Sequence, residues 1–532
     1  MKKILAILLV AVLLVGVLSA CGESSTPSKN QPGSSLQTDE TIEQTTQQVK
    51  KEVTMGYLGV YNTFCASTGL SDLTDAIGPR MVFDYLFETD DYTLETYSRT
   101  LESHEWLDDA TLKMTLKKGI LFSDGTEMTG NDILVTLRKY VENKFTEIKY
   151  YEIIDFDNSY VKDTYTVYLK YKEVNKAADA RLIIPIVSAA FWETHPDGDD
   201  AWWNGQVNGS GPYKVVDSVL DQHIVFEKRS DYWDDSVRYD ADKITVNFYT
   251  DGTALLADLQ NGVVDMALNL NNEMMSNLDV TSDSNIVLGT VSSYEIVKYC
   301  FNNVDGPTAD INVRKALTLS IDWTELAEVV YGLCGVIATS HYPTSFSCYE
   351  EHPAYSYDVE AAKQCLADAG YKAGDLTLYF LATDNEQRMI GEMAQYYYEQ
   401  IGVTLKVDQV EPFAAFSFMM DGTTHQIMLK QQPGGNPARE PFDDFFLPES
   451  VFRTAAITDT VYGDLMITAN MTTDDAERIA MYKQVDDYLY DNYQLIPIAE
   501  LLVGFAYNND IVSDFSVCSF GVRGSLASVR LP

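Results

Sequence analysis

The stretch Leu116-Lys-Lys-Gly-Ile-Leu-Phe-Ser-Asp-Gly-Thr-Glu-Met-Thr-Gly-Asn-Asp132 combines a tight turn with the start of a helix. Asp124 can accept a hydrogen bond from the backbone that follows it, and Gly125 tolerates a positive φ. Thr129 or Asn131 can then cap an amphipathic helix. We therefore predict a turn followed by a helix, in which these residues belong to the scaffold and not to a binding site.

Outward from this stretch, strand and helix patterns alternate along the chain. Residues that alternate with period two, as in strands, occupy 51–57, 165–171 and 244–249. Helical apolar faces follow Thr253, Asp310 and Asp358. Gly370 ends the last of these helices, because glycine readily takes the left-handed conformation of a helix end. The mixture predicts the α/β fold class.

Length and composition indicate a globular body of two or three domains. The chain has 532 residues, of which 46% are hydrophobic, and a formal net charge of −41. So acidic a surface would repel nucleic acid and anionic lipid alike, which argues against both as partners. Beyond the N-terminus no apolar run approaches the length of a membrane span, so we expect the body to be soluble.

The N-terminus reads as an export signal. Met1-Lys-Lys3 is positive, residues 4–18 are almost entirely apolar, and Ser19-Ala-Cys21 places small residues before a cysteine, which resembles a bacterial lipobox. We predict a signal peptide over 1–20, a lipid on Cys21 and a flexible linker over 21–48. The expected location is the outer face of the bacterial cytoplasmic membrane. The alternative is an ordinary signal peptide with a cysteine nearby.

Cys334, His341, Cys348 and His352 fall within one short stretch. Their side chains suit zinc, although the separations match no known finger. The alternatives are a Cys334–Cys348 disulfide and free or buried thiols, and we expect no metal site.

An extracellular hydrolase is the main rival class. The sequence has no His-Glu-x-x-His motif, and Asn208-Gly-Ser-Gly-Pro212 has the wrong spacing for a nucleophile elbow. The 79 acidic residues make pairs of carboxylates inevitable, so a glycosidase-like pair can be neither identified nor dismissed. We expect no enzyme activity and no cofactor.

Five segments, taken in order, resemble the extracytoplasmic solute-binding proteins of ABC importers, in the family that binds peptides, nickel complexes and related solutes (family 5). The segments are 116–132, Gly209-Ser-Gly-Pro-Tyr-Lys214, Asp310-Ile-Asn-Val-Arg-Lys-Ala-Leu-Thr-Leu-Ser-Ile-Asp322, residues 357–371 and Gln494-Leu-Ile-Pro-Ile498. The resemblance covers nearly the whole body.

The resemblance implies a periplasmic-binding-protein-like fold, with two lobes joined by a hinge and an extra subdomain on one lobe. The expected bounds are 49–81, 206–298 and 496–532 for lobe 1, 82–205 for the extra subdomain and 299–495 for lobe 2. It also implies a receptor that captures a small solute between the lobes and delivers it to ABC permease subunits. A sensing lipoprotein of the same fold is the alternative.

The same resemblance places ligand contacts after the first strand, after the helix at 133–141, and in a loop over 431–444. The candidates are Tyr57, Tyr61, Asn62, Tyr151, Arg439, Glu440 and Asp443. Arg439 could grip a ligand carboxylate, and Glu440 or Asp443 could pair with an ammonium group. Alternatively the two early tyrosines are core, and Arg439 pairs with a neighbouring acid.

This loop departs from the peptide-binding members, because Gly434-Gly-Asn-Pro-Ala-Arg-Glu-Pro441 replaces their usual Trp-x-Ala-Asp-Tyr-x-Asp-Pro string. An oligopeptide or dipeptide remains the expected solute, since it is commonest in the family. A nickel chelate or another solute is possible. We expect a monomer that meets the membrane only through its lipid.

Overall fold

The computed structural model describes residues 51–59, 78–89, 96–142, 151–172, 182–195, 206–278, 280, 284–433, 446–448, 450, 452–472, 474–515 and 526–532. The predicted signal peptide, Cys21 and the linker lie outside the described residues. So do Tyr61, Asn62, Arg439, Glu440 and Asp443.

A large mixed sheet forms the framework. Its order is β15-β14-β16-β12-β17-β11-β1-β10-β9-β8, and β13 pairs with β17 beside this path. The strands are β1 (Glu52–Leu58), β8 (Tyr213–Val219), β9 (His223–Lys228), β10 (Lys243–Tyr249), β11 (Met266–Leu270), β12 (Ile286–Phe301), β13 (Gly335–Ile337), β14 (Leu376–Ala382), β15 (Val403–Gln409), β16 (Ile427–Pro433) and β17 (Leu495–Asn508). The strands expected at 51–57 and 244–249 are thus confirmed as β1 and β10.

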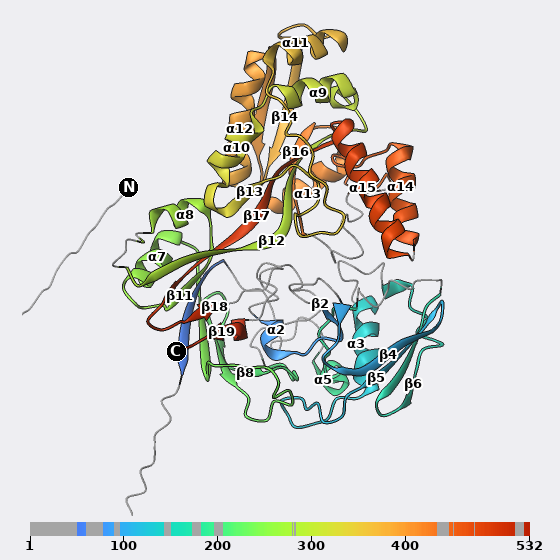
Figure 1. Cartoon of the computed structure of the whole chain (residues 1–532), viewed down its shortest axis with the longest axis vertical. Coiled ribbons are helices and arrows are strands. Elements are labelled where there is room, and N and C mark those ends of the chain that lie inside the picture. Colours follow the sequence, from blue (N-terminus) through green and yellow to red (C-terminus); the bar gives the residue numbers. More distant parts are fainter. Residues whose placement is uncertain are drawn as a thin grey trace, which may run out of the picture. The chain divides into compact units, whose positions relative to one another are not determined.

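Two parallel sets of strands are joined by two long antiparallel strands. β1 pairs in parallel with β10 and β11, and β14 pairs in parallel with β15 and β16. β12 and β17 pair antiparallel with each other over nearly their whole length. They run side by side from the region of α7 and α8 to that of α9 to α12 (Figure 1). The two parallel sets therefore belong to one continuous sheet.

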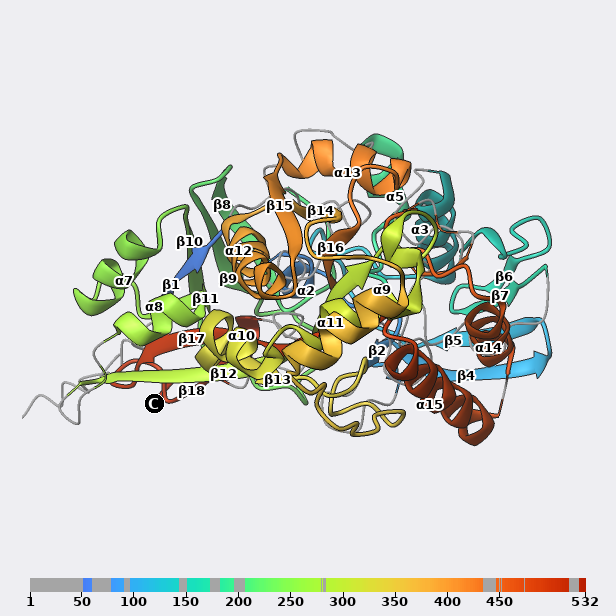
Figure 2. The same cartoon turned by 90° about the horizontal axis from the view of Figure 1, so that it is seen from above.

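The described helices include all four that the sequence predicts. They are α2 (Pro79–Val82), α3 (Gly130–Glu142), α5 (Ala189–Thr194), α7 (Gly252–Gln260), α8 (Asn272–Asn277), α9 (Ile311–Leu319), α10 (Trp323–Val330), α11 (Val359–Asp368), α12 (Asn385–Gln400), α13 (Pro412–Asp421), α14 (Thr460–Met471) and α15 (Asp475–Asp491). The last two pack side by side (Figure 2).

The caps of these helices follow from the short polar side chains before them. Asp310 and Asp358 cap α9 and α11, and Gly370 has a φ of 87° just beyond α11. The apolar face expected after Thr253 lies in α7, which begins one residue before Thr253, and Asp251 caps it by accepting a hydrogen bond from the Ala254 N–H at 2.9 Å. An extended Asp reaches the amide three residues ahead, which leaves Thr253 inside the first turn.

A separate four-stranded sheet leads into residues 116–132, the predicted turn and helix start. Its order is β4-β5-β7-β6. Its strands are β4 (Leu101–Asp108), β5 (Thr111–Leu116), β6 (Tyr160–Asp163) and β7 (Thr166–Lys170), the last being the strand expected at 165–171. The turn is confirmed, since Asp124 accepts from the Thr126 N–H at 2.8 Å and Gly125 has a φ of 84°. Thr129 occupies the residue before α3, and its hydroxyl accepts from the Asn131 N–H at 3.3 Å.

Alternate residues of each strand enter different cores, as the pleat of a strand requires. In β12, Tyr299 enters a core with α9 to α12, whereas Cys300 enters one with α14 and α15. In β11, Leu268 enters a third core and the adjacent Ala267 enters a fourth. The four-stranded sheet and α3 enclose a fifth core. Within the described part of the chain, no helix is long and apolar enough to cross a membrane.

Arg229 joins two of the sequence motifs, which the sequence analysis did not foresee. Its buried guanidinium donates to the carbonyls of Gly209 and Gly211 at 3.3 and 3.2 Å, and to those of Leu121 and Phe122 at 3.1 and 3.2 Å. A Cβ on Gly209 would lie 1.9 Å from a backbone carbonyl oxygen, so only glycine fits there. The turn and the Gly-Ser-Gly segment are thus one structural unit.

We expect Arg229→Lys to lower the free energy of unfolding by about 2 kcal/mol. The ammonium group of a lysine cannot donate to four buried carbonyls as the planar guanidinium does. Urea unfolding followed by circular dichroism measures the change. Arg238→Lys is the matched control, since Arg238 also pairs with an aspartate two residues ahead but is 68% exposed. Equal losses of unfolding free energy in the two variants would contradict the role of Arg229 in holding the turn and the Gly-Ser-Gly segment together.

Candidate functional site

The carboxyl ends of the two parallel sets converge on one point of the long strands. β11 ends at Leu270, which pairs with Gly504 of β17, and Gly504 pairs in turn with Thr290 of β12. β16 ends at Pro433, which pairs with Glu295 of β12. The two sets therefore point toward each other from either side. Ligands in open α/β sheets bind outside the carboxyl ends of parallel strands, so this convergence marks the candidate site.

A β-bulge separates the two ends. The pairing of β12 with β17 shifts between Ser292 and Ile296, and Tyr294 within the bulge has a φ of 56°. Ser293 Oγ donates to the Leu501 carbonyl at 3.0 Å. The left-handed conformation of a bulky residue is strained, and here the hydrogen bonds and the burial of Tyr294 hold it in place.

A buried carboxylate holds the bulge from the opposite strand. Glu500 of β17 is 4% exposed, and it accepts hydrogen bonds from Ser292 Oγ at 2.9 Å and from the Thr344 N–H at 3.0 Å. The four residues before it in β17, Ile496, Pro497, Ile498 and Ala499, are apolar and buried. Glu500 thus connects β12, β17 and the loop after β13.

On one side of the bulge, a depression of about 860 Å³ opens at the ends of β1 and β10. It is lined by residues from the strand ends, α7 and α8: Leu58, Gly59, Tyr249, Asp251, Gln260, Asn271, Glu273, Met274 and Asn277 among them. Asn269, at the end of β11, donates to the Leu58 carbonyl at 2.7 Å and so fixes the end of β1. The lining offers amides and carboxylates, and it includes no lysine or arginine.

On the other side, the first turn of α12 follows the end of β14. Glu386 in this turn lies beside Gln431 of β16, with 3.5 Å between Gln431 Nε2 and Glu386 Oε1. Burial raises the pKa of Glu386, Asp384 adds to the rise, and the Tyr331 hydroxyl opposes it. A partly desolvated carboxylate at the end of a parallel strand gains from a ligand cation that replaces the lost water.

The two sides touch at α8 and at η3, the short 3-10 helix Gly332–Cys334. Asn272 of α8 accepts a hydrogen bond from the Leu333 N–H at 2.8 Å. The Cys334 thiol lies 3.4 Å from Met275 Sδ and joins the core formed by α7 and α8. This contact fixes the separation of the two sides next to the bulge.

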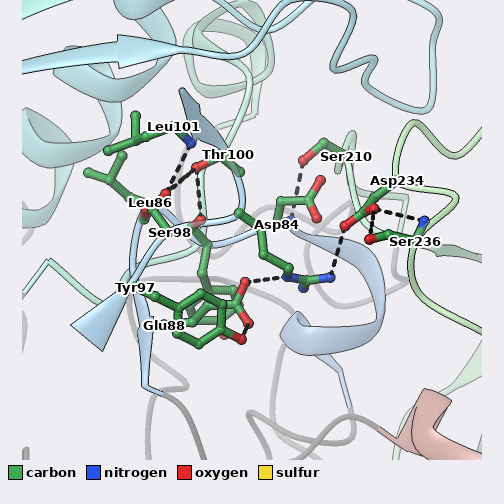
Figure 3. A network of polar contacts seen from close by, with 12 residues as sticks. Asp84, Leu86, Glu88, Tyr97, Ser98, Thr100, Leu101, Ser210, Asp234 and Ser236 are labelled. Carbon is green, nitrogen blue, oxygen red and sulfur yellow. Dashed lines mark hydrogen bonds and ion pairs between the residues drawn. The ribbon is translucent and has the colours of Figure 1, made fainter. Parts of the chain in front are cut away.

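A polar network anchors the hairpin β2 (Glu88–Thr89) and β3 (Thr96–Tyr97) (Figure 3). Arg99 binds Glu88 at 2.7 Å and lies 3.8 Å from Asp234. Asp84 is fully buried and accepts from the Tyr232 hydroxyl at 2.9 Å and from Trp233 Nε1 at 2.8 Å. Burial raises the pKa of Asp84, and the Arg99 charge is the main opposing influence. The network ties the segment after α2 to the loop before β10.

Two of the predicted ligand-binding residues are described, and both are packed in cores. Tyr57 is 3% exposed and meets Phe248 edge-on, with 6.1 Å between ring centroids. Tyr151 is also 3% exposed, and its ring centroid lies 5.6 Å from that of Tyr140. The structure does not bring the two together, since they belong to different cores. Their role in ligand binding stays a prediction, as does that of the five residues outside the described part.

The two cysteines of the stretch Cys334–His352 pack in different cores. Cys334 lies against α8, and Cys348 is buried in the core beside α14 and α15; both thiols are free. The disulfide alternative was therefore wrong, because the two side chains face separate cores, and the alternative of buried thiols describes them. The described residues contain no group of three or more His, Cys, Asp or Glu side chains suited to a metal.

Both histidines of that stretch bind one carboxylate that the sequence analysis missed. Asp486 of α15 is fully buried, 2.6 Å from His341 Nδ1 and 3.1 Å from His352 Nε2, and it accepts from Ser340 Oγ at 2.6 Å. His341 Nε2 lies 2.8 Å from the Leu495 carbonyl. No sequence signal marks this pairing, because 134 residues separate His352 from Asp486.

Comparisons with known proteins agree with this architecture. The sequence profile of the bacterial extracellular solute-binding proteins, family 5 Middle, matches residues 95–451. Heme-binding protein A of Haemophilus influenzae is 24% identical over 95% of this chain and 95% of its own length. Di/tripeptide-binding protein 1 of Pseudomonas aeruginosa is 24% identical over 79% of this chain and 83% of its own length.

Among solved structures, the ABC transporter substrate-binding protein CtaP of Listeria monocytogenes superposes with a TM-score of 0.77 at 20% identity, over 91% of this chain and 99% of that one. The likeness shows the fold, which is the two-lobed α/β fold predicted from the sequence. The profile match covers well over half of the chain. The chain belongs to family 5 of the bacterial extracellular solute-binding proteins.

Proposed function

We propose that this protein is the extracytoplasmic receptor of an ABC importer, which encloses a small solute where the two parallel sets of strands converge and passes it to the permease. Membership of the family carries the receptor role. The observation that carries the position of the site is the convergence of both sets of carboxyl strand ends on the bulge at Ser292–Ile296. Two lobes that close on this point would exclude water from a bound solute.

The proposed lobes keep the bounds expected from the sequence. Lobe 1 is 49–81, 206–298 and 496–532, the extra subdomain is 82–205, and lobe 2 is 299–495. Two kinds of observation support this division. Buried residues fall into separate cores on β1 to β11, on the four-stranded sheet, and on β14 to β16. Among the larger contacts between elements within the described residues, β12, β17 and the α8–η3 contact bridge the first and last of these.

The bulge is the proposed hinge. It lies a few residues from the crossings of the chain near Tyr299 and Ile496 that the family resemblance implies. A bulge with a left-handed residue can absorb a change of backbone angle more easily than regular paired strand. Solute shifts the balance toward the closed form only as far as it binds that form more tightly.

A solute with an ammonium group, such as a short peptide, fits the described edges. The depression at β1 and β10 contributes Asp251 and Glu273, and the opposite edge contributes Glu386. The relative named as a di/tripeptide-binding protein supports a peptide, whereas the one named as a heme-binding protein supports another class of solute. A nickel chelate remains a third class. A sensing receptor would use the same site without a permease.

The proposed location is the outer face of the cytoplasmic membrane, held by lipid on Cys21 after removal of residues 1–20 as a signal peptide. The linker 21–48 would keep the receptor at high local concentration beside its permease. The proposed role is binding, with the solute released chemically unchanged.

Arg439→Ala is expected to weaken solute binding about tenfold, which corresponds to 1.4 kcal/mol, because a two-point grip on a carboxylate would be lost. Isothermal titration with trialanine, or with the solute that mass spectrometry identifies in the purified protein, gives the dissociation constant. Arg453→Ala is the control, since Arg453 donates to the Pro448 carbonyl within its own loop. An unchanged dissociation constant for Arg439→Ala would remove Arg439 from the site.

A further inference from the structure

An apolar surface covers α10, η3, β13 and α12 on the proposed second lobe, and we call it the α10–α12 surface. α10 packs beside both α12 and β13 (Figures 1 and 2), and these elements and η3 carry six large apolar side chains that are at least 37% exposed. They are Tyr396 at 67% exposure, Val329 and Leu333 at 53%, Val336 at 46%, Ile337 at 38% and Met389 at 37%. Exposed apolar side chains gathered on neighbouring elements mark an interaction site more often than scattered ones do.

A groove of about 320 Å³ lies within this surface, between α10 and α12. Met389, Met393 and Tyr396 give its lining apolar surface, and Glu325 and Glu392 give it two carboxylates. Methionine side chains adapt to varied shapes, and they suit the aliphatic stem of a lysine or arginine. The carboxylates and the Tyr396 ring suit its cation.

Both carboxylates of the groove already have local partners. Glu325 accepts a hydrogen bond from the Tyr397 hydroxyl, and Glu392 pairs with Arg388 one turn away on α12. The side chains of that ion pair are 41% and 53% exposed. Such a pair contributes only about 0.3–0.5 kcal/mol, so an incoming cation can share or replace it at little cost.

The charge around the groove selects among possible occupants. Glu328 of α10 and Glu399 of α12 are two further exposed carboxylates on these helices, and Arg388 is the one lysine or arginine within α10 and α12. A second copy of this chain, with its net charge of −41, would meet like charge. An anionic membrane surface would be repelled in the same way. A protein segment with basic side chains around an apolar centre complements the surface in both respects.

We propose that the α10–α12 surface is the docking surface for a basic, apolar-tipped extracytoplasmic segment of the ABC permease, with one lysine or arginine side chain in the groove. This inference rests on the proposed receptor function and names the part of the receptor that the permease reads.

The α10–α12 surface includes an element that contacts the other proposed lobe. Leu333 belongs to η3, whose backbone binds Asn272 of α8 on the other lobe. A permease segment on Leu333 and Val329 therefore contacts the element that joins the two lobes next to the bulge. Any movement of α8 against η3 on closure would change the surface that the segment meets.

The test is photo-cross-linking in the source bacterium. p-Benzoylphenylalanine replaces Tyr396 or Val329 in the full-length lipoprotein, and it replaces Tyr160 or Val216 as controls. The control side chains are 47% and 48% exposed on the small sheet and on β8. We expect irradiation to join positions 396 and 329 to an ABC permease subunit, identified by mass spectrometry of the adduct, at a yield at least tenfold above the controls.

Charge complementarity is tested in the same cells. Glu325→Lys with Glu392→Lys should lower the adduct yield at position 396 at least tenfold and slow uptake of labelled trialanine, or of the identified solute, to a similar extent. The dissociation constant for that solute in purified protein should change less than twofold. Glu105→Lys with Glu227→Lys, two exposed carboxylates on β4 and β9, is the matched control.

Three outcomes would overturn the assignment: equal adduct yields at the control positions, an adduct with a second copy or with lipid alone, or unchanged uptake and adduct yield in the doubly reversed variant. The receptor function would survive these outcomes if the wild type still supported uptake. Conversely, a permease adduct at position 396 in cells where the wild type supports no uptake would leave the docking surface standing and remove the transport role.

Discussion

Replacing Asp486 with asparagine is expected to lower the free energy of unfolding by about 3 kcal/mol. Removing the charge of a buried carboxylate leaves its buried partners without a compensating charge. Asp486 accepts hydrogen bonds from His341, His352 and Ser340 within a core. Burial alone would raise its pKa, but the bonds from both histidines and the attraction of His341 hold the pKa well below its ordinary value. The midpoint of urea unfolding, followed by circular dichroism, reports the change.

The control for this variant is Asp487→Asn at the next position, whose side chain is 58% exposed. We expect a change below about 0.5 kcal/mol there, the usual size for a surface substitution. Similar losses in both variants would show that α15 tolerates neither substitution and that the buried cluster has no special weight.

The pH dependence of stability follows from the same cluster. The hydrogen bond from His352 to Asp486 raises the pKa of His352. Its contribution is therefore fully present below the unfolded value of about 6.5 and is lost as the pH rises through the higher folded value. The lowered pKa of Asp486 contributes stability above about pH 3.9, which is lost as the pH falls through the lower folded value. The cost of Asp486→Asn should thus be largest between about pH 4 and 6.5.

Replacing Cys21 with serine is expected to move more than nine-tenths of the protein from the membrane fraction to the medium or periplasm. Two acyl chains on one residue hold a protein stably, whereas we expect anionic lipid to repel the acidic body. Cell fractionation with immunoblotting gives the distribution. Trialanine or the identified solute should bind the released protein with an unchanged dissociation constant.

Ser24→Ala, in the expected linker, is the control for processing and export. If Cys21→Ser stayed in the membrane fraction at the level of this control, the proposed lipid anchor would be wrong. The receptor function does not depend on the anchor, so it would remain.

The local elements of the fold were predictable because each depends on near neighbours in sequence. Asp358 and Asp310 cap helices through amides two or three residues ahead, and Gly125 needs only its own turn. The helix after Thr253 was predictable for the same reason, and its cap, Asp251, lies two residues earlier. The arrangement into two lobes came from the family resemblance, because no local pattern records that β12 and β17 bridge two parallel sets.

The buried polar residues were not predictable, because each is completed by residues far away in the chain. Arg229 binds carbonyls 107 and 108 residues away, and Arg314 binds the carbonyls of Asn492 and Tyr493. Burial lowers the pKa of Arg314 to about 10, so the bound carbonyls stabilise a charge that the core disfavours. Glu500 was the nearest to a visible signal, as a lone charge in an apolar strand.

The candidate site was likewise predictable only where it depends on near neighbours in sequence. Leu58 and Gly59, at the end of the first strand, lie where the sequence placed a ligand contact, and they line the depression beside β10. Tyr57 alternates to the other side of the strand and packs in the core. Glu386 and Asn272 escaped notice, because the convergence of two strand ends on one bulge is a property of the sheet and not of any segment.

The central claim is that this chain binds a solute between two lobes and returns it unchanged. Native mass spectrometry of purified 22–532 protein tests it most directly, with the bound small molecule released by denaturation, identified, and added back to stripped protein. We expect one solute per chain, and recovery of the same intact molecule after prolonged incubation. Recovery of a chemically altered product, or a stripped protein that binds neither this molecule nor trialanine, would contradict it.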